Sequence, residues 1–111
     1  MAVVTGSPQR IAEERSIAYH GEIASLLAHR ADLLDAARDR VDSWLRDASV
    51  PRPYAEAWRD LIAGPFKELV AALVDPGERS RDLRQVSPFA GALDPRTRWR
   101  IHAEVRARQA R

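Results

Sequence analysis

The feature that most constrains the fold is a repeated helix-start signal, a small polar residue followed by proline. It occurs at Ser7-Pro8, Asp75-Pro76 and Asp94-Pro95. Proline suits the first helical position, where its missing N–H has no intrahelical partner, and the preceding Ser or Asp can accept a hydrogen bond from the first turn. Apolar residues between these signals recur every three or four positions, and no stretch alternates with the period of two typical of strands. The sequence therefore predicts an all-α fold with no sheet.

We expect a compact bundle of five to six helices in a single domain over residues 1–111, with residues 1–6 as a flexible N-terminus. The expected helices cover about 8–29, 32–50, 54–62, 66–74 and 76–86, followed by a basic C-terminal helix over 95–111. Asp32 is expected to cap the second helix. Glu13 and Glu14 are expected in the first turn of the first helix, facing the positive end of its dipole.

The segment Ser87–Leu93 separates the last two expected helices and contains proline, glycine and two large apolar residues. Phe89 and Leu93 are expected to pin this loop to the body of the protein. In the last helix, one side carries Trp99, His102, Ala103 and Arg106, and a neighbouring side carries Ile101 and Val105. Trp44 and Trp58 are expected in the core, whereas Trp99 lies between two arginines and is a candidate interface residue.

Several functional classes lack their sequence signals. The chain has no cysteine, which excludes disulfides and thiolate sites and favours a cytoplasmic location. Its longest apolar run, Leu69–Val74, is too short to cross a membrane. The three histidines, the isolated glycines and the serines form no metal, phosphate-loop or nucleophile motif. We therefore predict no enzyme activity, no cofactor and no metal, although a catalytic site assembled without a motif stays open.

The charge is divided unevenly between the two parts of the chain. Residues 1–78 contain nine Lys/Arg and thirteen Asp/Glu, whereas residues 79–111 contain nine Arg and three acids. A basic last helix is consistent with docking onto an acidic protein surface, either on another protein or on a second copy of this chain. It is also consistent with contacts to nucleic-acid phosphates, or with a solvated helix end whose arginines complement the dipole. The three alternatives stay open.

Three stretches carry a resemblance to a known group of proteins. They are Trp58-Arg59-Asp60-Leu61, the run Leu83-Arg84-Gln85 with Ser87-Pro88-Phe89-Ala90-Gly91, and Trp99-Arg100-Ile101. Over about half of its length the chain resembles small, largely uncharacterised actinobacterial helical proteins. The resemblance implies an antitoxin component of a toxin–antitoxin pair, which would bind and block a kinase-like or nucleotidyltransferase-like toxin encoded by a neighbouring gene. It implies no catalytic residues.

These observations favour a non-catalytic protein-interaction module, with an antitoxin as its concrete form. The predicted partner-binding residues lie in the C-terminal third: Phe89, Leu93, Arg96, Trp99, Arg100 and Arg106. The alternative is a small nucleic-acid-binding regulator that uses the arginines of the last helix, namely Arg96, Arg98, Arg100, Arg106 and Arg108. A homodimer is a further form that the partner could take.

Overall fold

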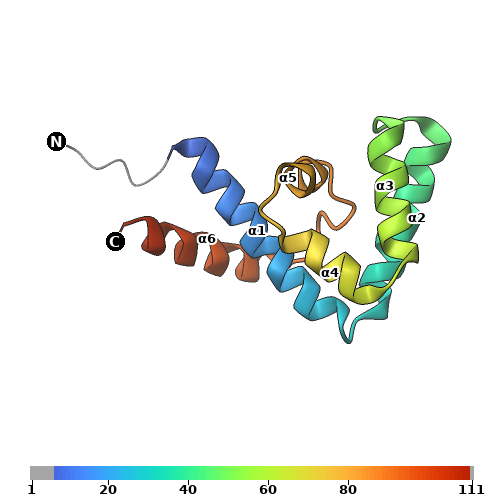
Figure 1. The fold of residues 1–111 in the computed structure, drawn as a ribbon. Helices are drawn as coiled ribbons and strands as arrows, with labels where there is room; N and C mark the ends of the chain where they lie inside the picture. Colours follow the sequence, from blue (N-terminus) through green and yellow to red (C-terminus); the bar gives the residue numbers. More distant parts are fainter. Residues whose placement is uncertain (1–6, 111) are drawn as a thin grey trace.

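The computed structural model describes residues 7–110, in which the chain forms six α-helices and no strand (Figure 1). This confirms the all-α prediction. The helices are α1 (Pro8–Leu27), α2 (Ala31–Asp47), α3 (Arg52–Ala63), α4 (Phe66–Val74), α5 (Glu78–Arg84) and α6 (Pro95–Gln109). The expected flexible N-terminus, residues 1–6, lies outside the described residues, as does Arg111.

Helix α1 is the element around which the others are arranged. Helices α6 and α4 both pack on it, while α2 and α3 pack on each other as a hairpin at the far side (Figure 1). The molecule is elongated, with extents of 51 × 28 × 24 Å. Within residues 7–110 no helix is long and apolar enough to cross a membrane.

One hydrophobic core draws residues from all six helices and from the segment between α5 and α6. Its largest fully buried side chains are Trp58, Leu69, Leu73, Val41 and Val105. Trp44 is partly buried and packs against this cluster, so the core positions expected for Trp44 and Trp58 are confirmed. Burial of such aromatic and branched side chains is the main favourable contribution to folding.

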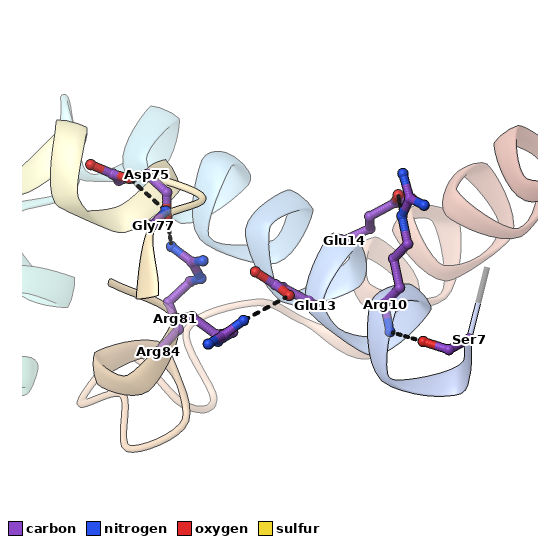
Figure 2. Close-up of polar contacts among 8 residues, drawn as sticks. All are labelled: Ser7, Arg10, Glu13, Glu14, Asp75, Gly77, Arg81 and Arg84. Carbon is purple, nitrogen blue, oxygen red and sulfur yellow. Dashed lines mark hydrogen bonds and ion pairs between the residues drawn. The ribbon is translucent and has the colours of Figure 1, made fainter. Parts of the chain in front are cut away.

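Two of the three helix-start signals act as expected. Ser7 Oγ accepts from the Arg10 N–H at 3.1 Å, and Asp94 Oδ1 accepts from the Thr97 N–H at 2.7 Å. The prediction of a helix start at Asp75-Pro76 is wrong. The Asp75 carboxylate instead accepts from the Gly77 N–H at 2.7 Å, which closes a turn (Figure 2). Helix α5 begins two residues after the proline.

Two predictions about helix ends are also wrong. The N-cap of α2 is Arg30, which makes no side-chain cap hydrogen bond, and Asp32 lies in the first turn, where it pairs with Arg30 at 2.8 Å. Because α1 begins at Pro8, Glu13 and Glu14 lie beyond its first turn, which contains no acidic residue. Glu14 pairs instead with Arg10 at 3.7 Å (Figure 2).

Candidate functional site

Two of the predicted partner-binding residues are in the core. Phe89 is 3% exposed and Leu93 is 7% exposed, so neither side chain offers a surface to a partner in this conformation. Their inclusion in an exposed binding face is therefore corrected, whereas the expectation that they pin the loop to the body is confirmed. Phe89 meets Trp58 edge to face, with the ring centroids 5.9 Å apart.

Polar contacts hold the backbone of the same segment. Arg40 of α2 donates from Nη1 to the carbonyl oxygens of Pro88 and Ala90, at 3.2 and 2.8 Å. Trp58 Nε1 donates to the Leu83 carbonyl at 3.2 Å, which fixes the end of α5. These contacts tie the segment between α5 and α6 to α2, and the end of α5 to α3, through side chains far away in the sequence.

The last helix has one buried face and one exposed face. Ile101 and Val105 are buried where α6 packs on α1. Trp99 is 71% exposed, which makes it the most exposed of the large hydrophobic side chains described. At 100° per residue, Arg96, Ala103 and Arg106 share its side of the helix. All three are exposed.

The arginines predicted for partner or nucleic-acid binding differ in their surroundings. Arg100 pairs with Glu22 at 3.2 Å and with Glu104 at 3.1 Å. Arg98 lies over the Tyr19 ring, 5.8 Å from its centroid. The others are exposed and form no ion pair within residues 7–110; they are Arg96, Arg106 and Arg108. Only part of the predicted basic surface is therefore available for phosphates or carboxylates.

Some of the charge asymmetry is satisfied within the chain. Arg81 of α5 forms an ion pair with Glu13 of α1 at 3.8 Å (Figure 2). Arg100 of α6 forms an ion pair with Glu22, which is also on α1. Gln109 also donates a hydrogen bond to Glu14. The acidic first helix and the basic C-terminal third thus meet inside one molecule.

The structure also contains a cavity that the sequence did not reveal. Its volume is about 510 Å³, and it lies between α1, the end of α2, α5, the Ser87–Leu93 segment and the start of α6. Its polar lining includes Arg15, His20, Arg84 and Ser87. The one available signal was the run from Leu83 to Gly91, singled out by resemblance, because most of that run lines the cavity.

A histidine–serine pair lines this cavity, formed by the buried His20 and the half-buried Ser87. His20 Nδ1 is 2.7 Å from the Ser16 carbonyl, which can only accept, so Nδ1 carries the proton. Nε2 is then an acceptor for the Ser87 hydroxyl at 2.9 Å. Burial lowers the pKa of His20, an effect that the Ser16 carbonyl opposes and Arg84 reinforces. The pair is therefore a neutral imidazole holding a serine hydroxyl, which also accepts from the Phe89 N–H at 3.2 Å.

Arg84 lies beside this pair and is 5% exposed. Its Nη1 donates to the carbonyl oxygens of Leu73 and Asp75, at 3.2 and 2.7 Å, where α4 ends; Figure 2 shows the contact to Asp75. A cation at a helix C-terminus complements the helix dipole. Burial lowers the pKa of Arg84, while Glu13 and Asp75 raise it. Within the described residues, its Nε and Nη2 have no hydrogen-bond partner.

Residues 7–110 contain no group of three or more His, Asp or Glu side chains placed to hold a metal ion. No protein-family model, curated protein or solved structure gives a significant match to this chain.

Proposed function

We propose that this chain is a protein-interaction module that docks onto an acidic surface of a partner protein through the exposed face of α6. This docking face consists of Arg96, Trp99, Ala103 and Arg106. In its concrete form the module is antitoxin-like and cytoplasmic. It binds and neutralises an enzyme encoded by a neighbouring gene, as the resemblance of the Leu83–Gly91 run and the Trp99-Arg100-Ile101 stretch implies.

The observation that carries the proposal is the exposure of Trp99. A tryptophan that leaves 71% of its surface in water contributes little to the core, and its indole offers a large contact area at low entropic cost. Tryptophan and arginine dominate the binding energy of many protein interfaces. The pairing of Trp99 with His102, with ring centroids 5.7 Å apart, further limits the freedom of the indole.

The charges around Trp99 indicate the chemistry of the partner. Arg96 and Arg106 share its side of α6, and neither has an ion pair within residues 7–110. Small Ala103 lies between them and lets a partner approach the helix backbone. A surface with carboxylates beside an apolar pocket for the indole would complement this face, because charge complementarity aids both encounter and register.

Co-expression with the product of the adjacent gene, followed by co-purification, tests the proposal. We expect a complex with the wild-type chain, and loss of that complex for Trp99→Ala and for Arg96→Glu combined with Arg106→Glu. Phe66→Ala is the matched control, because Phe66 is an exposed aromatic on α4, at 42%, outside the docking face. A complex that survives these α6 variants, or fails equally with Phe66→Ala, would contradict the proposal.

The same preparation separates the other two partners. A nucleic-acid contact would retain DNA with an affinity that falls steeply between about 50 and 200 mM salt, losing roughly one unit of log–log slope per arginine removed. A homodimer would have twice the monomer mass in light scattering, and Trp99→Ala would return the measured mass to that of the monomer. If either result is obtained and the neighbouring gene product does not bind, the partner is nucleic acid or a second copy of this chain instead of that product.

A further inference from the structure

The cavity beside His20 has the size of a ligand site. At about 510 Å³ it falls in the range of small-molecule pockets, about 300 to 1,000 Å³. It is separate from the docking face, because Arg96, Ala103 and Arg106 do not line it. Its function is therefore a question independent of the partner protein.

The charged side chains lining the cavity all have one sign. Arg15 comes from α1, Arg84 from the end of α5 and Arg98 from α6, whereas no Asp or Glu among the described residues lines it. The neutral His20 adds no negative charge. Glu13 is the carboxylate that most favours the charge of Arg84, but it pairs with Arg81 and is not part of the lining. The cavity therefore favours an anion.

Two of the arginines that line this cavity carry three buried nitrogens with no hydrogen-bond partner within residues 7–110: Arg15 Nε, Arg84 Nε and Arg84 Nη2. An unsatisfied buried donor costs about 1 to 3 kcal/mol, and more when it is charged. Native structures rarely tolerate this without a water, ion or ligand. In Arg84 the two free atoms form one edge of the guanidinium, which binds both oxygens of a carboxylate side by side.

The rest of the lining indicates what else the ligand contains. Apolar side chains form much of the wall, with contributions from Ile23, Trp44, Val86, Phe89 and Leu93. Inorganic anions would leave this surface against water, whereas a ligand with a hydrocarbon body would bury it. Tyr19, under the Arg98 guanidinium, also lines the cavity.

We propose that this cavity binds a small organic acid. The carboxylate accepts from Nε and Nη2 of Arg84, with Arg15 Nε as a further donor, and the hydrocarbon part packs against the half-buried Trp44 and Val86. Hydrogen bonds to the end of α4 hold Arg84 Nη1, and a side-chain shift opens the buried Nε–Nη2 edge to the cavity when the acid binds.

Titration calorimetry on the full chain tests this site with three carboxylates of increasing hydrocarbon size: benzoate, 2-naphthoate and decanoate. Each is compared with its neutral alcohol. We expect at least one acid to bind about tenfold or more tightly than its alcohol, the factor that one charge-assisted hydrogen-bond pair supplies. If no acid binds better than its alcohol, the proposal is wrong.

Variants then locate the binding. Arg84→Lys keeps the charge but removes the two-atom edge, and we expect it to weaken binding of the acid about tenfold. Arg15→Gln tests the same cavity from α1 in case the first variant does not fold. Arg108→Gln is the matched control, since it removes an exposed arginine of α6 that belongs neither to the cavity nor to the docking face. Equal losses in Arg15→Gln and Arg108→Gln would assign the binding to general surface charge and overturn the proposal.

Discussion

Nε2 of His20 lies 2.9 Å from Oγ of Ser87, across 67 positions of the sequence. This contact joins α1 to Ser87 in the segment that connects α5 and α6. That segment carries Phe89 and Leu93 into the core, and it forms part of the cavity wall. The histidine–serine contact therefore supports the position of the C-terminal third, including the helix that presents Trp99.

Replacing Ser87 by alanine should destabilise the fold. The change removes the hydrogen bond to His20 and leaves a buried imidazole nitrogen without its donor, and it also removes the acceptor for the Phe89 N–H. We expect a loss of about 1 to 3 kcal/mol in the free energy of unfolding, measured by urea denaturation. Ser25→Ala is the control, because Ser25 Oγ makes only an exposed contact to Gly21, and it should change stability by less than about 0.5 kcal/mol.

The stability of the protein should fall when the pH drops below about 6.5, the ordinary pKa of histidine. Burial lowers the pKa of His20 in the folded state, so the unfolded chain binds its proton at a higher pH than the folded chain does. The free energy of unfolding is therefore at its full value above that pH and decreases as the pH falls toward the folded pKa.

Urea unfolding at about pH 7.5 and pH 5.5 measures the difference in the free energy of unfolding between the two pH values. His20→Gln should make this difference smaller. His102→Gln is the comparison, because burial and the nearby Arg15 and Arg106 lower the pKa of His102 in the same direction. His20 is only 6% exposed, whereas His102 is partly exposed. The His20 variant should therefore remove more of the pH dependence of stability than the His102 variant does. An unchanged pH dependence in His20→Gln would show that this histidine is not the titrating group.

Truncation of Phe89 should destabilise the fold far more than truncation of Trp99, although both residues were predicted to bind a partner. Phe89→Ala opens a cavity beside Trp58 and should cost about 3 to 5 kcal/mol in unfolding free energy. Trp99→Ala removes a side chain that is mostly in water and should change stability by less than about 0.5 kcal/mol. Chemical denaturation followed by circular dichroism measures both. A large loss in Trp99→Ala would place that side chain in the core instead.

Local patterns were enough to predict the helices, because the spacing of apolar residues and the prolines act within a few positions. The start of α6 at Pro95 and the span of α4 agree with the sequence-based expectations. The helix start predicted at Asp75-Pro76 was wrong because the Asp75 carboxylate closes a turn to Gly77 before α5 begins. The same dipeptide pattern is compatible with a helix cap and with a turn, and sequence spacing does not distinguish them.

The candidate sites were less predictable, since they depend on contacts between distant residues. Exposure of Trp99 was suggested by its arginine neighbours, whereas Phe89 and Leu93 could not be assigned to the core or to an interface by residue type. The cavity combines arginines from α1, α5 and α6, so no sequence window contains it. Pairing of Arg100 with Glu22 likewise depends on the packing of α6 on α1, which periodicity does not specify.

The end of α2 offers a way to stabilise the protein. Its C-cap residue is Ala48, which has φ 58° and ψ 29° in the left-handed region, and its N–H donates to the Trp44 carbonyl at 3.0 Å. A Cβ atom makes this conformation unfavourable by about 1 to 2 kcal/mol, whereas glycine adopts it freely. Glycine also gains entropy in the unfolded chain, which offsets part of the benefit.

Ala48→Gly should therefore raise the free energy of unfolding by about 0.5 to 1 kcal/mol in urea denaturation. Ala36→Gly is the matched control, because Ala36 is also exposed on α2 but lies in its interior. There glycine has only the entropic disadvantage and should lower stability by about 1 kcal/mol. Changes of the same sign in the two variants would mean that Ala48 does not hold a left-handed conformation in solution, because only that conformation makes glycine the better residue.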